Sequence, residues 1–275
     1  MTLSLYYPSY PLNGFVESMF FYEGYDPGHD IDKFLPDGNT EIIFELNDNP
    51  QHIYEPDTLR EIQSCRNSWV SGIRTNPICI PSGKNSRMIV VTFKKGRAYP
   101  FYKIPLRTLT DQVVDASLIF GKPIVELRER LLQAKNPEAM FALIESFLIE
   151  AASDKLNPSP AAGCVEYAVA RIRQAPHSLA MEELNREIGF SQKHFIQLFK
   201  DHVGLTPKGY QRILRFQKAI LEIEKQPAPF WDVVVHHCGY YDQAHFIGEF
   251  KHYSGLTPQE YMQQKSDLVN YIPVK

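Results

Sequence analysis

The stretch HFIQLFKDHVGLTPKGY, from His194 to Tyr210, returns 51 residues later as HFIGEFKHYSGLTPQEY, from His245 to Tyr261. Ten of these 17 positions are identical, in a chain of 275 residues without low-complexity sequence. A match this dense indicates one structural unit that the chain uses twice. The spacing of its apolar residues predicts that the unit is helical.

The first copy has the pattern of a helix-turn-helix, in which a helix, a glycine turn and a second capped helix follow one another. Its first helix is expected over residues 178–187 with Ser178 as N-cap, Gly189 makes the turn, and Ser191 caps the next helix. The side chains expected to face inward on that second helix are Phe195, Leu198 and Phe199, and those expected to face outward are Lys193, Ile196, Gln197 and Lys200.

The second copy follows the same plan, with a helix over residues 231–238, a turn at Gly239 and Asp242 as the next cap. The inward side chains are expected to be Phe246, Phe250 and Tyr253, and the outward ones Gln243, Ala244, Ile247, Gly248 and Lys251. Between the copies, an amphipathic helix is expected over residues 208–225. A helix of about 18 residues spans roughly 27 Å, which is comparable with the roughly 34 Å between successive major grooves on one face of DNA.

The rest of the chain differs in character. Two prolines and small polar residues at 153–163 predict a linker between a domain of residues 1–152 and a helical domain of residues 164–265, followed by a tail of residues 266–275. Short runs rich in Val, Ile and Phe, at residues 15–22, 40–46 and 87–93, predict strands separated by turns such as Pro36-Asp37-Gly38-Asn39. From 123 to 150 the period becomes helical, with a break at Asn136-Pro137. We therefore expect an α+β chain of two domains, the first β-rich, with a cupin-like barrel as one form, and closed by two helices.

Charge and cysteine content restrict the function classes. The formal net charge is −3, and residues 161–275 hold 13 Lys and Arg against 12 Asp and Glu, so a nucleic-acid hypothesis has to rest on fold and motif. The four scattered cysteines form no C-x-x-C pair, which favours buried thiols over a zinc site or disulfides. The start of the chain has no basic and apolar leader, and no apolar run approaches a membrane span, so we expect a cytoplasmic protein.

The C-terminal hundred residues resemble the DNA-binding domain of the AraC/XylS family of transcription regulators. The matching residues are Gly189-Phe190-Ser191, Leu198-Phe199-Lys200, Gly204-Leu205-Thr206-Pro207, Tyr210, Leu214-Arg215-Phe216, Ala219, Cys238-Gly239-Tyr240, Asp242-Gln243, His245-Phe246, Glu249-Phe250-Lys251 and Gly255-Leu256-Thr257-Pro258-Gln259-Glu260-Tyr261. The N-terminal part resembles the sensor-like domain of one branch of that family through Leu35-Pro36-Asp37-Gly38 and residues 70–75 and 93–101.

The resemblance implies a sequence-specific regulator whose two recognition helices enter adjacent major-groove segments. By position, Lys193, Ile196 and Gln197 would reach base edges, where lysine donates to guanine, glutamine pairs with adenine and isoleucine packs on a thymine methyl. Phosphate or flanking contacts are expected from Gln192, His194 and Lys200, and the matching DNA-facing residues of the second helix are Gln243, Ala244, His245, Ile247 and Lys251.

Two departures from the family pattern bear on DNA binding. Gly248 stands where the branch usually carries a long basic residue, so the second unit is expected to read DNA weakly and to lose about 1 kcal/mol of helix propensity. His236 and His237 stand where the branch has apolar residues. Neighbouring helical residues point about 100° apart, which disfavours a metal pair there. For Arg215, a solvated charge or a salt bridge is favoured over a DNA contact, as it is for Lys218.

The N-terminal domain offers weaker signals. Its candidate ligand contacts are Arg74, Arg97, Tyr99 and Phe101, with Phe20, Tyr22, Phe34 and Phe44 as further candidate wall residues. We expect no metal, no catalytic residue and no cofactor. The expected partners are double-stranded promoter DNA, a small-molecule effector, a second copy of the chain and, for an activator, RNA polymerase, but no membrane. An enzyme or repair domain fused to a DNA-targeting module, and an interaction module with weakened DNA binding, remain as alternatives.

Overall fold

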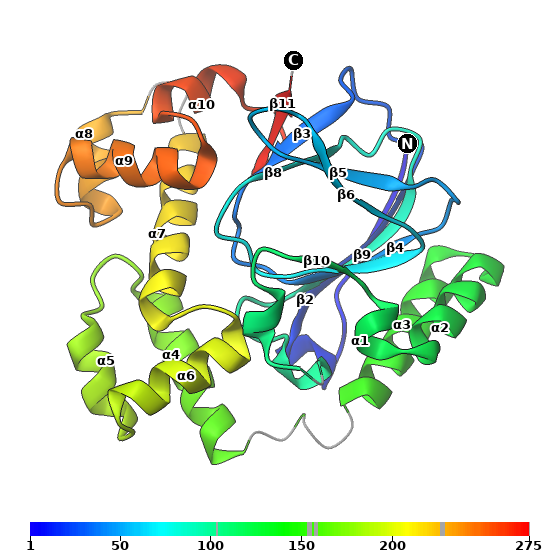
Figure 1. Ribbon diagram of the computed structural model, residues 1–275, viewed down its shortest axis with the longest axis horizontal. Coiled ribbons are helices and arrows are strands. Elements are labelled where there is room, and N and C mark those ends of the chain that lie inside the picture. The colour runs from blue at the N-terminus through cyan, green and yellow to red at the C-terminus, as the bar shows by residue number, and fades with distance from the viewer. Residues whose placement is uncertain (103, 153–155, 157–158, 226–228, 275) are drawn as a thin grey trace.

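A computed structural model describes residues 1–102, 104–152, 156, 159–225 and 229–274. Its N-terminal half contains two antiparallel sheets, and its C-terminal half is helical (Figure 1). The strands are β1 (Thr2–Tyr6), β2 (Val16–Glu23), β3 (Ile31–Phe34), β4 (Glu41–Glu45), β5 (Gln51–Tyr54), β6 (Glu61–Cys65), β7 (Ser68–Ser71), β8 (Ile78–Pro81), β9 (Arg87–Phe93), β10 (Val113–Asp115) and β11 (Tyr271–Val274). The fold class expected from the sequence is confirmed.

One sheet has the order β1-β2-β9-β4-β7-β10, and the other has the order β11-β3-β8-β5-β6. Side chains alternate across the larger sheet. Ile42 and Phe44 of β4 join a core with the helices that cover this sheet, whereas Ile43 between them faces the second sheet. The larger sheet is therefore apolar on both faces, which explains why its strands appear in the sequence as near-continuous apolar runs.

Helices α1 (Ser117–Phe120), α2 (Lys122–Gln133) and α3 (Pro137–Ala152) close one face of the larger sheet. The predicted break at Asn136-Pro137 is where α3 begins, and the Asn136 side chain accepts a hydrogen bond from the Ala139 amide at 2.9 Å. Two closing helices were expected, and the short α1 is an addition. Three 3-10 turns, η1 (Leu12–Gly14), η2 (Tyr99–Phe101) and η3 (Leu106–Leu109), complete this half.

The helical half consists of α4 (Pro160–Gln174), α5 (Met181–Ile188), α6 (Gln192–Val203), α7 (Pro207–Glu224), α8 (Trp231–His237), α9 (Gln243–Ser254) and α10 (Pro258–Gln264). The 18-residue α7 runs between the group α4–α6 and the group α8–α10 (Figure 1). Its predicted extent is confirmed to within one residue at each end. Within the described residues, no helix has the length and apolarity needed to cross a membrane.

Three boundaries expected from the sequence are wrong. Helix α4 begins at Pro160, inside the segment 153–163 expected to be linker, because the Ser159 side chain caps it by accepting a hydrogen bond from the Ala162 amide at 3.2 Å. Ser178 is not a cap, since α5 begins at Met181. The Leu179 carbonyl instead accepts a bond from Gln211 Nε2 at 2.7 Å, which holds this stretch outside the helix.

The third correction concerns residues 266–275, expected to be a C-terminal tail. Within them, β11 pairs antiparallel with β3, with Tyr271 opposite Phe34 and Val274 opposite Ile31. The chain thus returns from its helical half to add an edge strand to the N-terminal domain, as Figure 1 shows where the red β11 lies beside the blue β3.

Candidate nucleic-acid interface

The first helix-turn-helix consists of α5, a left-handed turn at Gly189 (φ +74°) and α6. As predicted, the Ser191 hydroxyl caps α6 by accepting a bond from the His194 amide. Phe195 and Phe199 are buried in the helical core, which fixes the rotation of α6 about its axis. On the opposite face Gln192, Lys193, His194 and Gln197 are exposed, whereas Ile196, Leu198 and Lys200 are half-buried.

The second unit repeats this geometry. Gly239 (φ +69°) makes the turn, and a Cβ there would lie 2.4 Å from the His177 carbonyl oxygen, so glycine is required on two grounds. Asp242 caps α9 through a bond of 2.7 Å from the His245 amide. Phe246 and Phe250 are buried. The DNA-facing candidates Gln243, Ala244, His245, Ile247 and Lys251 are all exposed.

Several candidate side chains have intramolecular partners. Gln197 Nε2 donates to Asp201 Oδ1 at 3.1 Å, and Gln243 Nε2 donates to Asp232 Oδ1 at 2.8 Å. Each amide would have to leave its carboxylate to pair with a base, whereas no hydrogen bond or ion pair engages the Lys193 ammonium among the described residues. Lys193 is therefore a readily available donor on α6.

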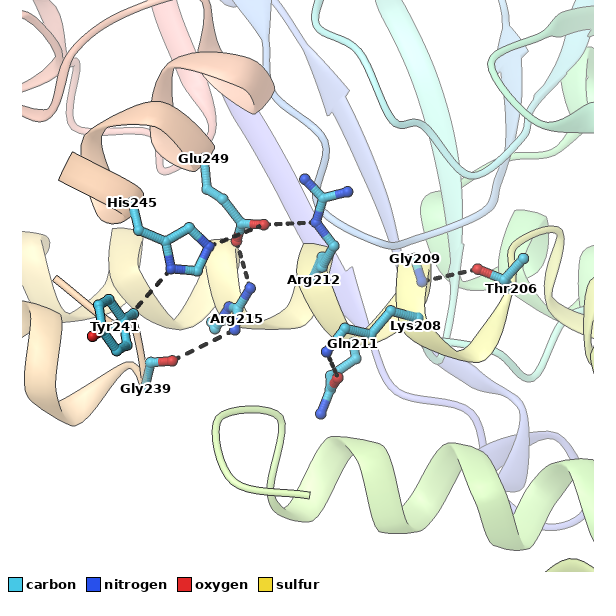
Figure 2. Close-up of polar contacts among 10 residues, drawn as sticks. All are labelled: Thr206, Lys208, Gly209, Gln211, Arg212, Arg215, Gly239, Tyr241, His245 and Glu249. Carbon is cyan, nitrogen blue, oxygen red and sulfur yellow. Dashed lines mark hydrogen bonds and ion pairs between the residues drawn. The ribbon is translucent and has the colours of Figure 1, made fainter. Parts of the chain in front are cut away.

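A buried ion-pair cluster attaches the second unit to α7, as Figure 2 shows. Glu249 of α9 accepts bonds of 2.6 Å from Arg212 Nε and from Arg215 Nη2, and His245 Nε2 lies 3.8 Å away. Burial opposes ionisation, but these hydrogen bonds and the two guanidinium charges lower the pKa of the Glu249 carboxyl. Arg215 also lies over the Tyr240 ring, 4.8 Å from its centroid. Arg215 is thus a structural salt-bridge residue, as favoured from the sequence.

Gly248 lies on the exposed face of α9. Among the described residues, nothing comes within 4 Å of the position that a Cβ would take, and the residue has no positive φ. A larger side chain therefore fits here without strain. His236 and His237 are also exposed, so neither enters the core of the second unit.

The four candidate ligand contacts of the N-terminal domain do not line a common cavity. Arg74 is buried and donates to the Asn76 carbonyl at 3.3 Å, while Arg97 pairs with Glu166 of α4 at 2.8 Å. Tyr99 stacks on His202 of α6 with ring centroids 3.8 Å apart. Phe101 lies in the core under α3, together with Phe44, whereas Phe20, Tyr22 and Phe34 line a cavity between the sheets. Sequence reasoning missed the other cavity residues, because the side of a buried strand cannot be assigned when both faces are apolar.

The three N-terminal segments that carry the family resemblance share a location that the sequence did not indicate. The segment at residues 35–38 contacts α7, where Gln217 Nε2 donates to the Pro36 carbonyl at 2.7 Å. The segment at 70–75 contributes Ile73 to the helical core, and the segment at 93–101 brings Gly96 against Val169 of α4. All three therefore lie where the sheets meet the helix-turn-helix units.

Further contacts join η3 and its neighbours to α6. The Thr110 hydroxyl donates to the Gly204 carbonyl at 2.7 Å, and Arg107 forms an ion pair with Asp201. Asp201 also holds Gln197, so the N-terminal domain is connected to one of the candidate DNA-facing side chains through one carboxylate.

Among the described residues, no group of three or more His, Cys, Asp or Glu side chains could hold a metal ion.

Residues 4–115 match a family described as a domain of unknown function, and residues 184–264 match a helix-turn-helix domain. An uncharacterised helix-turn-helix transcriptional regulator of Haemophilus influenzae is 27% identical over 125 residues, which are 45% of this chain. The chain spans 39%, or about two fifths, of the length of that curated relative.

Among solved structures, ToxT from Vibrio cholerae is similar with a TM-score of 0.46 at 10% identity, over 95% of this chain and 97% of ToxT. A structure of ToxT with a bound unsaturated fatty acid gives a TM-score of 0.45 at 10% identity, over 95% of this chain and 94% of ToxT. The matched domains and the paired capped units together show a helix-turn-helix domain joined to an N-terminal domain from a family of unknown function.

Proposed function

We propose that this protein regulates transcription by sequence-specific binding of double-stranded DNA, with α6 and α9 in adjacent major-groove segments. The observation that carries the proposal is the pair of similarly capped helices, each with one face in the core and the other in solvent. A major groove accommodates such a helix. Helix α7, about 27 Å long at 1.5 Å per residue, holds the two units apart by a distance of the order of one helical turn of DNA.

The outward-facing side chains of the two helices contribute unequally to the proposed recognition of DNA. Helix α6 offers an ammonium from Lys193, an amide from Gln197 and an apolar surface from Ile196, a set that can distinguish guanine, adenine and thymine. Helix α9 offers Gln243 and Ile247, with a bare position at Gly248. We infer that the first unit supplies more of the sequence discrimination, and that the second contributes more to register on the DNA backbone.

The N-terminal domain would modulate this binding through a small molecule or through dimerisation. Support comes from its contacts with the first unit, through Tyr99 on α6, and with the joining helix, through Pro36 on α7. In addition, β11, which follows the second unit in the chain, pairs with β3 of the N-terminal domain. A ligand or a second copy that favours one arrangement of these contacts would change the population of the DNA-binding arrangement. As an activator, the protein would in addition contact RNA polymerase.

The test is selection of bound sequences from a random duplex library by the full chain, repeated with Lys193→Ala and, as the matched control, Lys225→Ala on the far end of α7. Enrichment of two short motifs about one helical turn apart supports the proposal. The Lys193 variant should lose preference at one position of the first motif, whereas the control should keep the full pattern. No enrichment by the parent chain would contradict the proposal.

Gly248 and the near-neutral helical half favour one second candidate, an interaction module in which DNA binding has weakened. The two functions differ in the salt dependence of DNA affinity. A regulator that neutralises phosphates shows a steep decrease of affinity with salt concentration, and an interaction module shows no salt-sensitive DNA complex at all.

A further inference from the structure

The two sheets of the N-terminal domain enclose a cavity of about 340 Å³. In the larger sheet, side chains on one face pack against α1–α3, and side chains on the other face line the cavity. Ile43 and Val90 therefore line it, whereas Ile42 and Val91 do not. Strands of both sheets contribute to it. This volume lies in the range of sites for small organic molecules.

Two carboxyl groups, those of Asp32 and Glu41, are set into this mainly apolar wall. His29 Nε2 lies 2.8 Å from Asp32 Oδ1, and the Thr92 hydroxyl donates to Glu41 Oε1 at 2.9 Å. Burial raises the pKa of Asp32 despite the neighbouring His29, and burial together with the Asp37 charge raises that of Glu41 to about 7, because the ionised form is unfavourable in an apolar wall.

The cavity surface includes Met1 and His52 but is poor in basic side chains. No lysine or arginine occurs among the described residues that line it, and His52 at its rim pairs with Glu61 at 3.0 Å. Lys95 acts on Glu41 only from outside the cavity, where its ammonium binds Asn39 Oδ1 at 3.0 Å. An anionic ligand would therefore meet two carboxyl groups and no lysine or arginine side chain, whereas a cationic ligand would find carboxyl partners.

Aromatic rings supply much of the remaining wall. The rings that line the cavity belong to Phe20, Tyr22, Tyr25, Phe34, Trp69 and Tyr271. Phe20 and Tyr22 are stacked with centroids 6.1 Å apart, and Phe34 and Tyr271 lie 5.0 Å apart. Aromatic faces attract ammonium groups, most strongly where water is excluded.

The C-terminal segment completes the cavity. Leu268 and Tyr271 line it, although both follow the second helix-turn-helix unit in the chain. This segment is attached to α7, where Gln217 Nε2 donates to Asn270 Oδ1 at 2.9 Å, and Ile272 is buried in the helical core. One strand therefore touches the cavity on one side and the DNA-binding half on the other.

We propose that this cavity binds an apolar organic amine, whose ammonium pairs with one of the two wall carboxyl groups, Asp32 or Glu41, and that it does so only while β11 is docked on β3. Binding would then stabilise the docked position of the second helix-turn-helix unit. The proposal deepens the proposed function, on which its regulatory consequence rests, but amine binding itself is measured without DNA.

Three probes of similar size distinguish a cationic, a neutral and an anionic ligand. They are 2-phenylethylamine, 2-phenylethanol and 3-phenylpropanoate, each titrated calorimetrically into the full chain. The amine should bind at least about tenfold more tightly than the alcohol, and the carboxylate should not bind. In the double variant Asp32→Asn with Glu41→Gln, the amine affinity should decrease to about that of the alcohol, while alcohol binding stays unchanged and shows that the cavity is intact. Equal affinities for the three probes, or no binding of the amine, would overturn the proposal.

The coupling to β11 is tested with Ile272→Asp, which places a charge in the helical core but does not touch the cavity wall. Amine affinity should decrease at least about tenfold, whereas Leu221→Asp, the same change at an exposed position of α7, should leave it unchanged. In the parent chain, the amine should slow amide hydrogen exchange in Tyr271–Val274. Unchanged exchange and unchanged affinity would refute the coupling. Failure to bind DNA both with and without amine would count against the proposed function alone.

Discussion

Replacing Glu249 by glutamine tests whether the ion-pair cluster holds the second helix-turn-helix unit in place. The substitution keeps the size of the side chain and one acceptor oxygen but removes the negative charge. The Glu249 and Arg215 side chains are 8% and 11% exposed, so their pair is largely desolvated, whereas Arg212 is 39% exposed. When the carboxylate is removed, water can therefore solvate the charge of Arg212 but not that of Arg215.

The expected loss of unfolding free energy follows from that difference in exposure. Removing one partner of a buried ion pair costs about 3–5 kcal/mol, and loss of an exposed pair costs about 1 kcal/mol or less. Arg215 retains the Tyr240 ring and a long bond of 3.5 Å to the Gly239 carbonyl, which places the expected loss near the lower end of that range. We expect Glu249→Gln to lower the free energy of unfolding of the second unit by about 3 kcal/mol.

Urea unfolding followed by Trp231 fluorescence measures this loss, since Trp231 of α8 lies beside Phe246 with ring centroids 6.2 Å apart. The other tryptophan, Trp69, lies in the N-terminal domain and is changed to phenylalanine in all samples. The control Arg212→Ala should lose no more than about 1 kcal/mol. A loss below about 1 kcal/mol for Glu249→Gln would refute the idea that the cluster is desolvated, and a double change of Glu249 and Arg215 to methionine should recover most of the stability.

Three further outcomes are expected. Lys193→Ala and Gln197→Ala should each weaken specific DNA binding by roughly 1–3 kcal/mol and leave non-specific binding little changed in a competition assay, whereas equal loss on all sequences would mean that they touch only the backbone. Because a side chain at position 248 meets no neighbour, Gly248→Arg should raise the stability of α9 by up to about 1 kcal/mol, measured by urea unfolding. The same change should raise DNA affinity, measured by fluorescence anisotropy. The control Gly204→Arg should destabilise the protein, because Gly204 has a φ of +94°. Burial lowers the pKa of His202 to about 4 from an ordinary value near 6.5, so its neutral form stabilises the fold above pH 6.5 and that contribution is lost as the pH falls through 4. His202→Phe should therefore reduce the loss of unfolding free energy between pH 7 and 4.5 by roughly 2 kcal/mol, and an unchanged pH dependence would contradict the burial of a neutral imidazole.

The features predicted well from the sequence are local. Ser191 and Asp242 cap α6 and α9 because a side chain three residues before an amide reaches it whatever the rest of the chain does. The extent of α7 was predicted for the same reason, because residues three and four apart in the sequence share one face of a helix. Ser178 failed as a cap because a distant residue, Gln211 of α7, uses the carbonyl of Leu179. Local capping rules cannot include such a competitor.

The elements that the sequence did not indicate depend on partners far along the chain. Strand β11 has four residues, one of them Pro273, and it pairs with β3 about 240 residues earlier. A strand so short has no period of its own, and a proline marks it as an edge strand only once its neighbour is known. The candidate ligand residues were misplaced for the same reason, because an aromatic such as Tyr99 is equally plausible against a ligand or against His202.

The arrangement of these long-range contacts limits how a signal could travel from the cavity. The cavity and α9 share no wall residue among those described, so a ligand cannot act on the second unit by direct contact. Residues 268–272 do touch both the cavity and α7, and β11 is held by only four residue pairs to β3. A short edge segment that contacts both sites is the element whose docked population a cavity ligand would change. The first unit is attached differently, through Tyr99, Arg107 and Thr110, none of which lines the cavity. A cavity ligand should therefore change the position of the second unit more than that of the first.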